Sequence, residues 1–381
     1  MNNSWSFSVN NTDTINNSFD IEFLKQEIGQ RIPFYDMRIS ANAVLFFVTI
    51  DKDKVNSLFD QIRRSLVSNG YIPYLRHEQG EHIIYVMKKP QRKEKSIWIN
   101  IGLLIAVIIT TTLTGSLLQM GVSDLQSLSN ITDVFLPENI LNGILFFSFP
   151  LMSILFIHEM GHYFISKRHG IHTSLPFFIP IPPILPGFNI GTFGALISSN
   201  DPMPNKKALF DVGISGPIAG FLVALPVTII GLITSNNYLP ISSISEGQIV
   251  LGSSILFSIL SQLFLSVPAG YYIDLNSIAF AGWIGMLITS INLLPAGQLD
   301  GGHMFRAVFG EKQKYASWIA IFIMVFTGWF FFALIILFLI GTSHPPPLND
   351  DGTLDVKRKL LFIVGVLILL ICFIPYPIYA L

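Results

Sequence analysis

Long apolar stretches dominate the chain from about residue 97 onward. A helix of about 20 apolar residues is long enough to span the roughly 30 Å hydrocarbon core of a bilayer. Six stretches meet this criterion, namely Ile97–Met120, Ile140–Lys167, Ala208–Thr234, Ile278–Pro295, Ala316–Ile340 and Leu360–Ala380. The pattern predicts a polytopic α-helical membrane protein with about six transmembrane helices.

The first 90 residues follow a different pattern. Residues 1–19 are rich in Asn, Ser and Thr and contain no basic segment followed by an apolar core. They therefore predict a polar, flexible tail and not a signal peptide. Ala43–Ile50 is rich in β-branched and aromatic residues and favours a strand. Asp51–Val67 has apolar residues at helical spacing and predicts an amphipathic helix.

Two further strands, Tyr71–Arg76 and His82–Val86, are expected around a turn at Glu78–Glu81. Together these elements predict a small soluble α+β domain. We see no catalytic cluster in its sequence, which favours a docking or regulatory module over a second active site. The predicted organisation is a tail (1–19), this soluble domain (20–92), a transmembrane core (93–310) and C-terminal transmembrane helices (311–381).

The basic residues give an orientation, because cytoplasmic loops carry an excess of Lys and Arg. A basic run precedes the first apolar stretch, made of Lys88, Lys89, Arg92, Lys93 and Lys95. The loops Gly121–Asn139 and Ser235–Gln248 contain no Lys or Arg. We therefore expect both chain ends and the active-site side on the cytoplasmic side of a membrane, with the cell membrane as the default.

Two stretches complicate this orientation. Ile249–Val267 is apolar but contains five serines and one glutamine. A full span there would put the basic residues Arg306, Lys312 and Lys314 outside, so we interpret it as interfacial or re-entrant. With six spans, the basic residues Lys357–Lys359 fall on the outer side of the membrane, which disagrees with the excess of Lys and Arg expected in cytoplasmic loops.

Composition agrees with a membrane protein and excludes other classes. Of the 381 residues, 51% are hydrophobic and 12% are charged, about half the roughly 25% usual for soluble proteins. This argues against a disordered chain and against a purely soluble enzyme. A net charge of -1 gives no basic excess for binding nucleic acid. The single cysteine, Cys372, excludes an intramolecular disulfide and a thiolate metal cage.

The second apolar stretch contains the sequence HEMGH at residues 158–162. On a helix, His158 and His162 lie on one face and can present two imidazole nitrogens to one metal ion. Glu159 is then placed to accept a proton from a metal-bound water. The alternative is a hydrogen-bonded histidine pair in a core. Ionisable residues within an apolar span are costly, which favours the metal site.

A catalytic zinc usually keeps three protein ligands and one open position. Asp300, in the sequence NLLPAGQLDGGH at residues 292–303, is the best third candidate. Pro295 and Gly297 should break the helix there, and two following glycines permit close backbone approach. The alternative is that Asp300 only caps the next helix. Asn292 would assist by donating to a developing oxyanion, or would only make an interhelical hydrogen bond.

Together these two motifs resemble those of the site-2 protease family of intramembrane zinc metalloproteases. The resemblance covers roughly residues 140–310 and includes the segments GTFGALI (191–197) and DVGISGPIAG (211–220). It implies a zinc endopeptidase that binds one Zn²⁺ and cleaves transmembrane or membrane-proximal segments of other membrane proteins. The chain departs from several members of the family in showing no obvious PDZ insertion between the motifs and no obvious C-terminal CBS pair, so regulation through such modules is not implied.

Peptide hydrolysis within a membrane requires an unwound substrate, since a helix hides its carbonyl groups in internal hydrogen bonds. The segment Leu175–Ser199 contains too many prolines for a helix and ends in a β-prone stretch. We expect a membrane-associated β-hairpin, whose residues Gly194, Ala195, Leu196 and Ile197 bind substrate by strand addition. A hairpin that only shields the site is the alternative.

Two rival functions stay open at this level. One is a membrane-surface zinc protease with a different third ligand, such as a downstream glutamate. The other is a non-catalytic membrane metal-binding protein, which would have no need of a general base. For the protease, the expected partners are the lipid bilayer, a transmembrane protein substrate and a regulatory partner through the N-terminal domain, with no nucleic acid.

Overall fold

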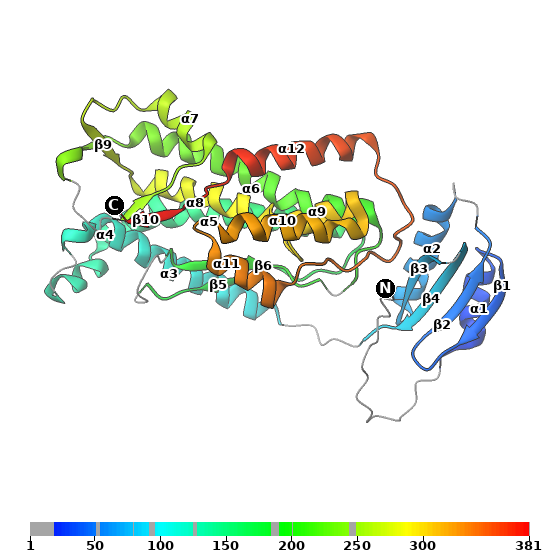
Figure 1. The fold of residues 1–381 in the computed structure, drawn as a ribbon. Coiled ribbons are helices and arrows are strands. Elements are labelled where there is room, and N and C mark those ends of the chain that lie inside the picture. Colours follow the sequence, from blue (N-terminus) through cyan, green and yellow to red (C-terminus); the bar gives the residue numbers. More distant parts are fainter. Residues whose placement is uncertain are drawn as a thin grey trace. The chain divides into compact units, whose positions relative to one another are not determined.

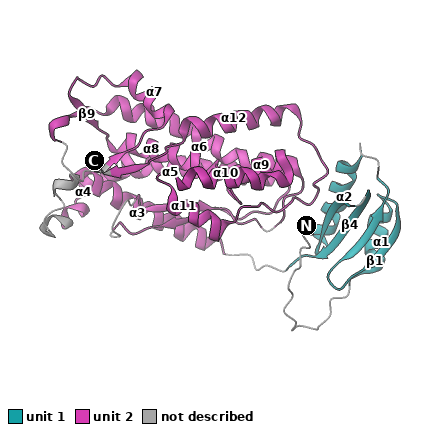
Figure 2. Cartoon of the chain, in the orientation of Figure 1, with its two compact units in different colours: residues 1–91 teal, residues 92–381 magenta. Residues whose placement is uncertain are grey.

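A computed structural model describes residues 19–50, 54–78, 80–90, 96–124, 128–183, 190–199, 201–243 and 249–380. It divides into two compact units, residues 1–91 and residues 92–381 (Figure 2). The tail predicted for residues 1–19 lies outside the described residues except for Phe19, as do Arg92, Lys93 and Lys95 of the basic run. The finer domain boundaries stay predictions.

The N-terminal unit is a four-stranded antiparallel sheet with two helices. Its elements are α1 (Ile21–Gly29), β1 (Phe34–Ile39), β2 (Val44–Val48), α2 (Val55–Ser68), β3 (Tyr71–Glu78) and β4 (Glu81–Lys88), with strand order β1-β2-β4-β3. Apolar side chains of both helices, such as Leu24 and Ile62, are fully buried. The predicted α+β region is confirmed, including the turn where Glu78 pairs with Glu81.

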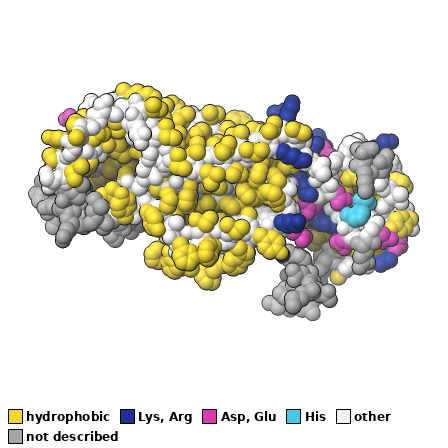
Figure 3. Space-filling model, turned by 45° about the horizontal axis from the view of Figure 1, so that its top comes forward, with side chains coloured by type: hydrophobic (Ala, Val, Ile, Leu, Met, Phe, Trp, Pro, Cys, Tyr) yellow, Lys and Arg dark blue, Asp and Glu magenta, His cyan; other side chains and the backbone are white. Residues whose placement is uncertain are grey.

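The second unit is mostly helical (Figure 1). Its principal helices are α3 (Ile97–Asp124), α4 (Pro137–Gly143), α5 (Phe149–Arg168), α6 (Lys206–Thr234), α7 (Ile255–Phe264), α8 (Ser277–Asn292), α9 (Asp300–Phe309), α10 (Gln313–Val325), α11 (Phe330–Ile335) and α12 (Val356–Cys372). Short π-helical segments join α4 to α5 (Ile144–Ser148) and extend α11 (Ile336–Ile340). Hydrophobic side chains cover most of the visible face of this unit (Figure 3).

Within the part of the chain that the structure describes, three helices are long and apolar enough to cross a membrane: Ile97–Met120, Pro137–Arg168 and Lys206–Thr234. The other apolar helices are shorter. Helix α7 has ten residues, about 15 Å at 1.5 Å per residue, which is half the thickness of a bilayer core. This length agrees with an interfacial or re-entrant role for Ile249–Val267.

Short strand pairs flank the helices. They are β5 (Phe177–Pro180) with β6 (Thr192–Leu196), β7 (Asn237–Pro240) with β9 (Tyr271–Asp274), and β8 (Ile249–Leu251) with β10 (Ile378–Ala380). The predicted hairpin is present as β5–β6, although residues 184–189 between its strands lie outside the described residues. It is held on α3, where the Thr110 hydroxyl donates to the Gly191 carbonyl at 2.6 Å. The Asn100 amide donates to the Leu175 carbonyl at 2.7 Å.

The stretch Ala316–Ile340 is not one helix, so that prediction is wrong. Helix α10 ends at Val325, and α11 begins at Phe330 after a turn. The backbone N–H of His344, beyond α11, donates to the side chain of Gln313 at the start of α10. The chain therefore returns to the end from which α10 started, as a helical hairpin.

This return corrects the expected placement of the last basic cluster and of the C-terminus. At the start of α12, Arg358 bonds Asp211 near the start of α6, so Lys357–Lys359 share one end of the bundle with Lys206. We name this the charged end. The strand β10 pairs with β8, which follows the opposite end of α6. The C-terminal strand therefore lies away from the charged end, and the helix predicted to Ala380 stops at Cys372.

Candidate metal centre

The three predicted ligands lie close together around one point. On α5, the Nε2 atoms of His158 and His162 are 3.2 Å apart. The Asp300 carboxylate on α9 places its Oδ2 3.3 Å from the first and 3.2 Å from the second. A tetrahedral zinc with ligand bonds of about 2.0–2.1 Å separates neighbouring ligand atoms by about 3.3 Å. The nearly equilateral triangle of two nitrogens and one oxygen therefore fits zinc and leaves a fourth position for water.

Close packing of α5 against α6 sets the positions of the two histidines. A Cβ atom added at Gly161 would lie 2.7 Å from the Ser215 carbonyl oxygen, so the two backbones nearly touch. A Cβ atom at Gly216 would collide with the Nε2 atom of His162. The glycines of α6 thus form a surface on which both imidazoles rest, as expected for small residues at a helix crossing.

A backbone hydrogen bond fixes the orientation of His162. Its Nδ1 lies 2.8 Å from the carbonyl oxygen of Val212 on α6. Because a carbonyl only accepts, Nδ1 carries the proton and Nε2 keeps its lone pair for a metal. The sequence motifs did not reveal this partner, since a backbone carbonyl leaves no mark on residue type.

The turn between α8 and α9 directs Asp300 toward the histidines. Helix α8 ends at Asn292, and Gly297 adopts a left-handed conformation with φ of 46°. A Cβ atom at Gly301 would collide with the Leu293 carbonyl, so the turn is wound tightly against the start of α9. Asp300 is the first residue of α9 and Leu299 its N-cap, so the carboxylate does not act as the cap. The helix breaking and close approach predicted from the glycines are confirmed.

Glu159 and Asn292 lie beside the three ligands. Glu159 is 8% exposed and makes no hydrogen bond or ion pair with any residue in the described part of the chain. Its carboxylate is therefore free to bind a water molecule. The Asn292 amide nitrogen lies 3.4 Å from the Nε2 atom of His158, so this side chain reaches the edge of the cluster.

The remaining histidines of this unit bind other groups. His169 contacts Asp211 at 2.9 Å and His172 contacts Asp201 at 2.6 Å, both near the charged end. His303 and His344 contact each other at 2.6 Å. None of them joins the cluster of His158, His162 and Asp300 among the described residues. In the N-terminal unit, His77 and His82 form a cross-strand pair at 3.3 Å.

The residues predicted to bind substrate lie on and just after β6 and not in the metal cluster. Gly194, Ala195 and Leu196 belong to the strand, and Ile197 follows it. The side chains of Phe193 and Leu196 are 77% and 64% exposed. In the described part of the chain, β5 is the one strand paired with β6. Helix α5 also contacts β6, so the strand lies close to the helix that carries the histidines.

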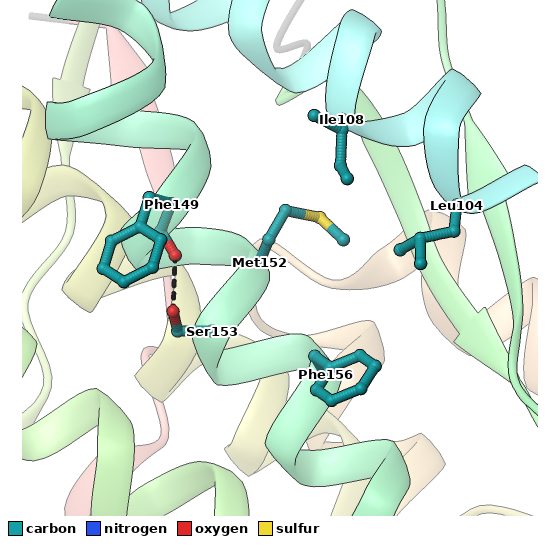
Figure 4. Close-up of a pocket in the computed structure, with 6 residues that line it drawn as sticks. All are labelled: Leu104, Ile108, Phe149, Met152, Ser153 and Phe156. Atoms are coloured by element: carbon teal, nitrogen blue, oxygen red, sulfur yellow. Dashed lines mark hydrogen bonds between the residues drawn. The ribbon is translucent and has the colours of Figure 1, made fainter. Parts of the chain in front are cut away.

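A separate cavity of about 250 Å³ lies between α3 and α5 (Figure 4). Its lining is apolar apart from one hydroxyl: Leu104, Ile108, Phe149, Met152, Ser153 and Phe156. The Ser153 hydroxyl donates to the Phe149 carbonyl at 2.7 Å. The side chains that line the cavity therefore include no ionisable group and no histidine or cysteine for a metal or for acid–base chemistry.

Comparison with known proteins adds family information to this geometry. Residues 146–335 match the model of Peptidase family M50. Probable zinc metalloprotease EGY1, chloroplastic, of Oryza sativa subsp. japonica is 28% identical over 240 residues, which cover 60% of this chain and 40% of that protein. Probable zinc metalloprotease EGY2, chloroplastic, of Arabidopsis thaliana is 30% identical over 236 residues, covering 59% of this chain and 40% of that protein.

The chain spans about two fifths of the length of these curated relatives. No solved structure matches it. The match to the family model contains both histidines, Glu159 and Asp300. The resemblance inferred from the two motifs is confirmed, and the chain belongs to peptidase family M50.

Proposed function

We propose that this protein is an intramembrane zinc metalloendopeptidase that cleaves transmembrane or membrane-proximal segments of other membrane proteins. The triangle of His158, His162 and Asp300 carries the proposal, because two imidazole nitrogens and one carboxylate oxygen at this spacing match the ligand set of a catalytic zinc. Membership of a peptidase family supports it.

In this proposal His158, His162 and Asp300 hold the metal. Zinc, when bound there, supplies Lewis acidity that activates a water molecule and polarises the substrate carbonyl. The Glu159 carboxylate accepts the proton of the attacking water and returns it to the leaving amine nitrogen. The Asn292 amide donates a hydrogen bond to the oxyanion that develops on the carbonyl oxygen. The Val212 carbonyl keeps His162 in the required tautomer.

We propose that the charged end faces the cytoplasm, following the positive-inside rule. Helices α3, α4–α5, α6, α8 and α12 would cross the bilayer, and the α10–α11 hairpin would enter it from the charged end. His162 lies about 9 Å along α5 from Arg168, at 1.5 Å per residue. The site would then sit below the cytoplasmic surface, within reach of water. The N-terminal unit would lie on the same side, available to a regulatory partner.

The substrate must be extended at the bond that is cut. We propose that it pairs with the outer edge of β6 at Gly194–Ile197, which adds a third strand to the β5–β6 hairpin. The exposed Phe193 and Leu196 side chains would contact its apolar residues. The hairpin is suited to this role because hydrogen bonds to α3 hold it in place.

The two rivals make different predictions. A protease with a downstream glutamate ligand would not need Asp300, whereas the observed carboxylate contacts both histidines. A metal carrier would not need the free carboxylate of Glu159. The deciding experiment is cleavage of a single-span substrate co-reconstituted with the purified chain in lipid vesicles. Zinc-dependent cleavage that is lost in Glu159→Gln supports the proposal, and zinc binding without cleavage would favour the carrier.

A further inference from the structure

The turn that carries Asp300 is held from outside by the C-terminal helices. The Pro295 carbonyl oxygen, in the middle of this turn, accepts from the Ser317 hydroxyl at 2.6 Å and from the Gln313 amide at 3.2 Å. Both donors are on α10 and are fully buried. A carbonyl freed by a helix break within an apolar unit needs such partners, because water is excluded.

The segment after α11 completes this arrangement. The Gln313 side chain donates to Ser317 at 2.8 Å and accepts from the backbone N–H of His344 at 3.2 Å. The imidazole of His344 contacts His303 on α9 at 2.6 Å, one turn beyond Asp300. A Cβ atom at Gly297 would collide with the Gly341 carbonyl, so the two backbones are in contact.

Apolar contacts reinforce the same junction. Leu294 and Ala296 of the turn are buried in one cluster with Met324 of α10 and with Ala333 and Ile336 of the α11 segment. The α10–α11 hairpin therefore meets the turn with both its polar and its apolar side chains.

We propose that Gln313, Ser317, Gly341 and His344 form a C-terminal clamp that positions Asp300 for the metal. This inference rests on the proposed zinc site. In it, the role of the α10–α11 hairpin is to hold the turn that carries Asp300. Gln313 is the central positioning residue, because its one side chain joins the Pro295 carbonyl, Ser317 and the His344 backbone. Two of the four residues, Gly341 and His344, lie beyond the residues 146–335 matched by the family model.

The test uses the full chain in detergent and the variant Gln313→Leu, which keeps the side-chain volume but removes all three hydrogen bonds. Zinc affinity is measured by competition with a chelator, and the visible spectrum of the Co²⁺-substituted protein reports the ligand geometry. We expect a loss of zinc affinity of about tenfold or more, the order seen when groups that orient metal ligands are removed. The Co²⁺ spectrum should shift toward that of Asp300→Asn.

Trp329→Phe is the matched control. It removes a hydrogen bond of 2.7 Å from the Trp329 indole to the Ile374 carbonyl in the same C-terminal region. It leaves the hydrogen bonds to the Pro295 carbonyl in place and keeps an aromatic ring against the apolar cluster. Even if Trp329→Phe lowers the melting temperature as much as Gln313→Leu does, it should keep wild-type zinc affinity. If Gln313→Leu does not fold, Ser317→Ala is used in its place, because it removes the hydrogen bond from the Ser317 hydroxyl to the Pro295 carbonyl and leaves Gln313 unchanged. Ser317→Ala should weaken zinc binding several-fold.

Wild-type affinity and spectrum in Gln313→Leu, or in Ser317→Ala if that variant alone folds, would overturn the clamp. An equal loss of affinity in Trp329→Phe would overturn it too, because the effect would then be general destabilisation. These outcomes differ from failure of the proposed function, in which the wild-type chain itself would bind no zinc or cleave no substrate.

Discussion

The Nδ1 atom of His162 donates a hydrogen bond to the carbonyl oxygen of Val212 at 2.8 Å. This contact joins the helix that carries the HEMGH sequence to the glycine-rich start of α6. It aims the Nε2 atom of His162 at His158 and Asp300. The geometry of the metal centre therefore depends on how closely α5 and α6 pack.

Gly216→Ala tests this dependence. The added methyl group would collide with the Nε2 atom of His162, so we expect the imidazole to shift and both zinc affinity and cleavage to fall by about tenfold or more. Gly102→Ala on α3 is the control, since nothing lies within 4 Å of its added Cβ atom. Metal competition and melting temperature give the comparison. If Gly216→Ala bound zinc as tightly as Gly102→Ala, the packing argument would be wrong.

Glu159→Gln separates metal binding from catalysis. The amide keeps the size of the side chain but cannot accept a proton, so cleavage should fall by about 10²–10⁴-fold, the usual contribution of a general base. Zinc content should stay close to wild type, because Glu159 is outside the ligand triangle. Single-turnover cleavage in vesicles and metal analysis on the same sample measure the two effects. Undiminished cleavage would remove Glu159 from the mechanism.

Ala195→Pro tests substrate binding at β6. Proline removes a backbone N–H from the strand and should lower cleavage at least severalfold, while zinc content is unchanged. Ala195→Val is the matched control, since it keeps the N–H and suits a strand. Equal cleavage by the two variants would favour a hairpin that only shields the site.

The charged end gives a topological prediction. With Cys372 replaced by Ala, Lys207→Cys and Lys357→Cys should react with an impermeant maleimide from one side of sealed vesicles. Tyr379→Cys, on the strand that pairs with β8, should react from the other side. Labelling of Lys357→Cys and Tyr379→Cys from the same side would contradict the described path of the last helix.

The residues of the metal centre could be predicted from the sequence more accurately than the course of the C-terminal helices. His158, His162 and Asp300 were identifiable because ionisable groups in apolar stretches are costly and stand out. The glycines at 297 and 301 marked the turn for a similar reason, since close backbone approach excludes side chains. The Val212 carbonyl was not identifiable, because any residue type supplies one.

The C-terminal region shows where sequence reasoning failed. Ala316–Ile340 is continuously apolar, and composition alone does not distinguish one long helix from two short ones that reverse direction. The reversal is stabilised by tertiary contacts, such as the hydrogen bonds of Gln313 to the Pro295 carbonyl and to the His344 backbone. The six-span prediction had placed the basic residues Lys357–Lys359 on the outer side, against the positive-inside rule. The reversal of the chain after α10 explains this disagreement, because it returns these residues to the charged end.

The central claim is that Asp300 completes a zinc site with two histidines from a distant helix. X-ray absorption at the zinc edge of the purified chain tests it most directly. We predict two imidazole nitrogens and a carboxylate oxygen at about 2.0–2.2 Å. In Asp300→Asn, zinc affinity should fall and the oxygen contribution should change. An identical spectrum and affinity in Asp300→Asn, or a wild-type spectrum without two imidazoles, would contradict the account.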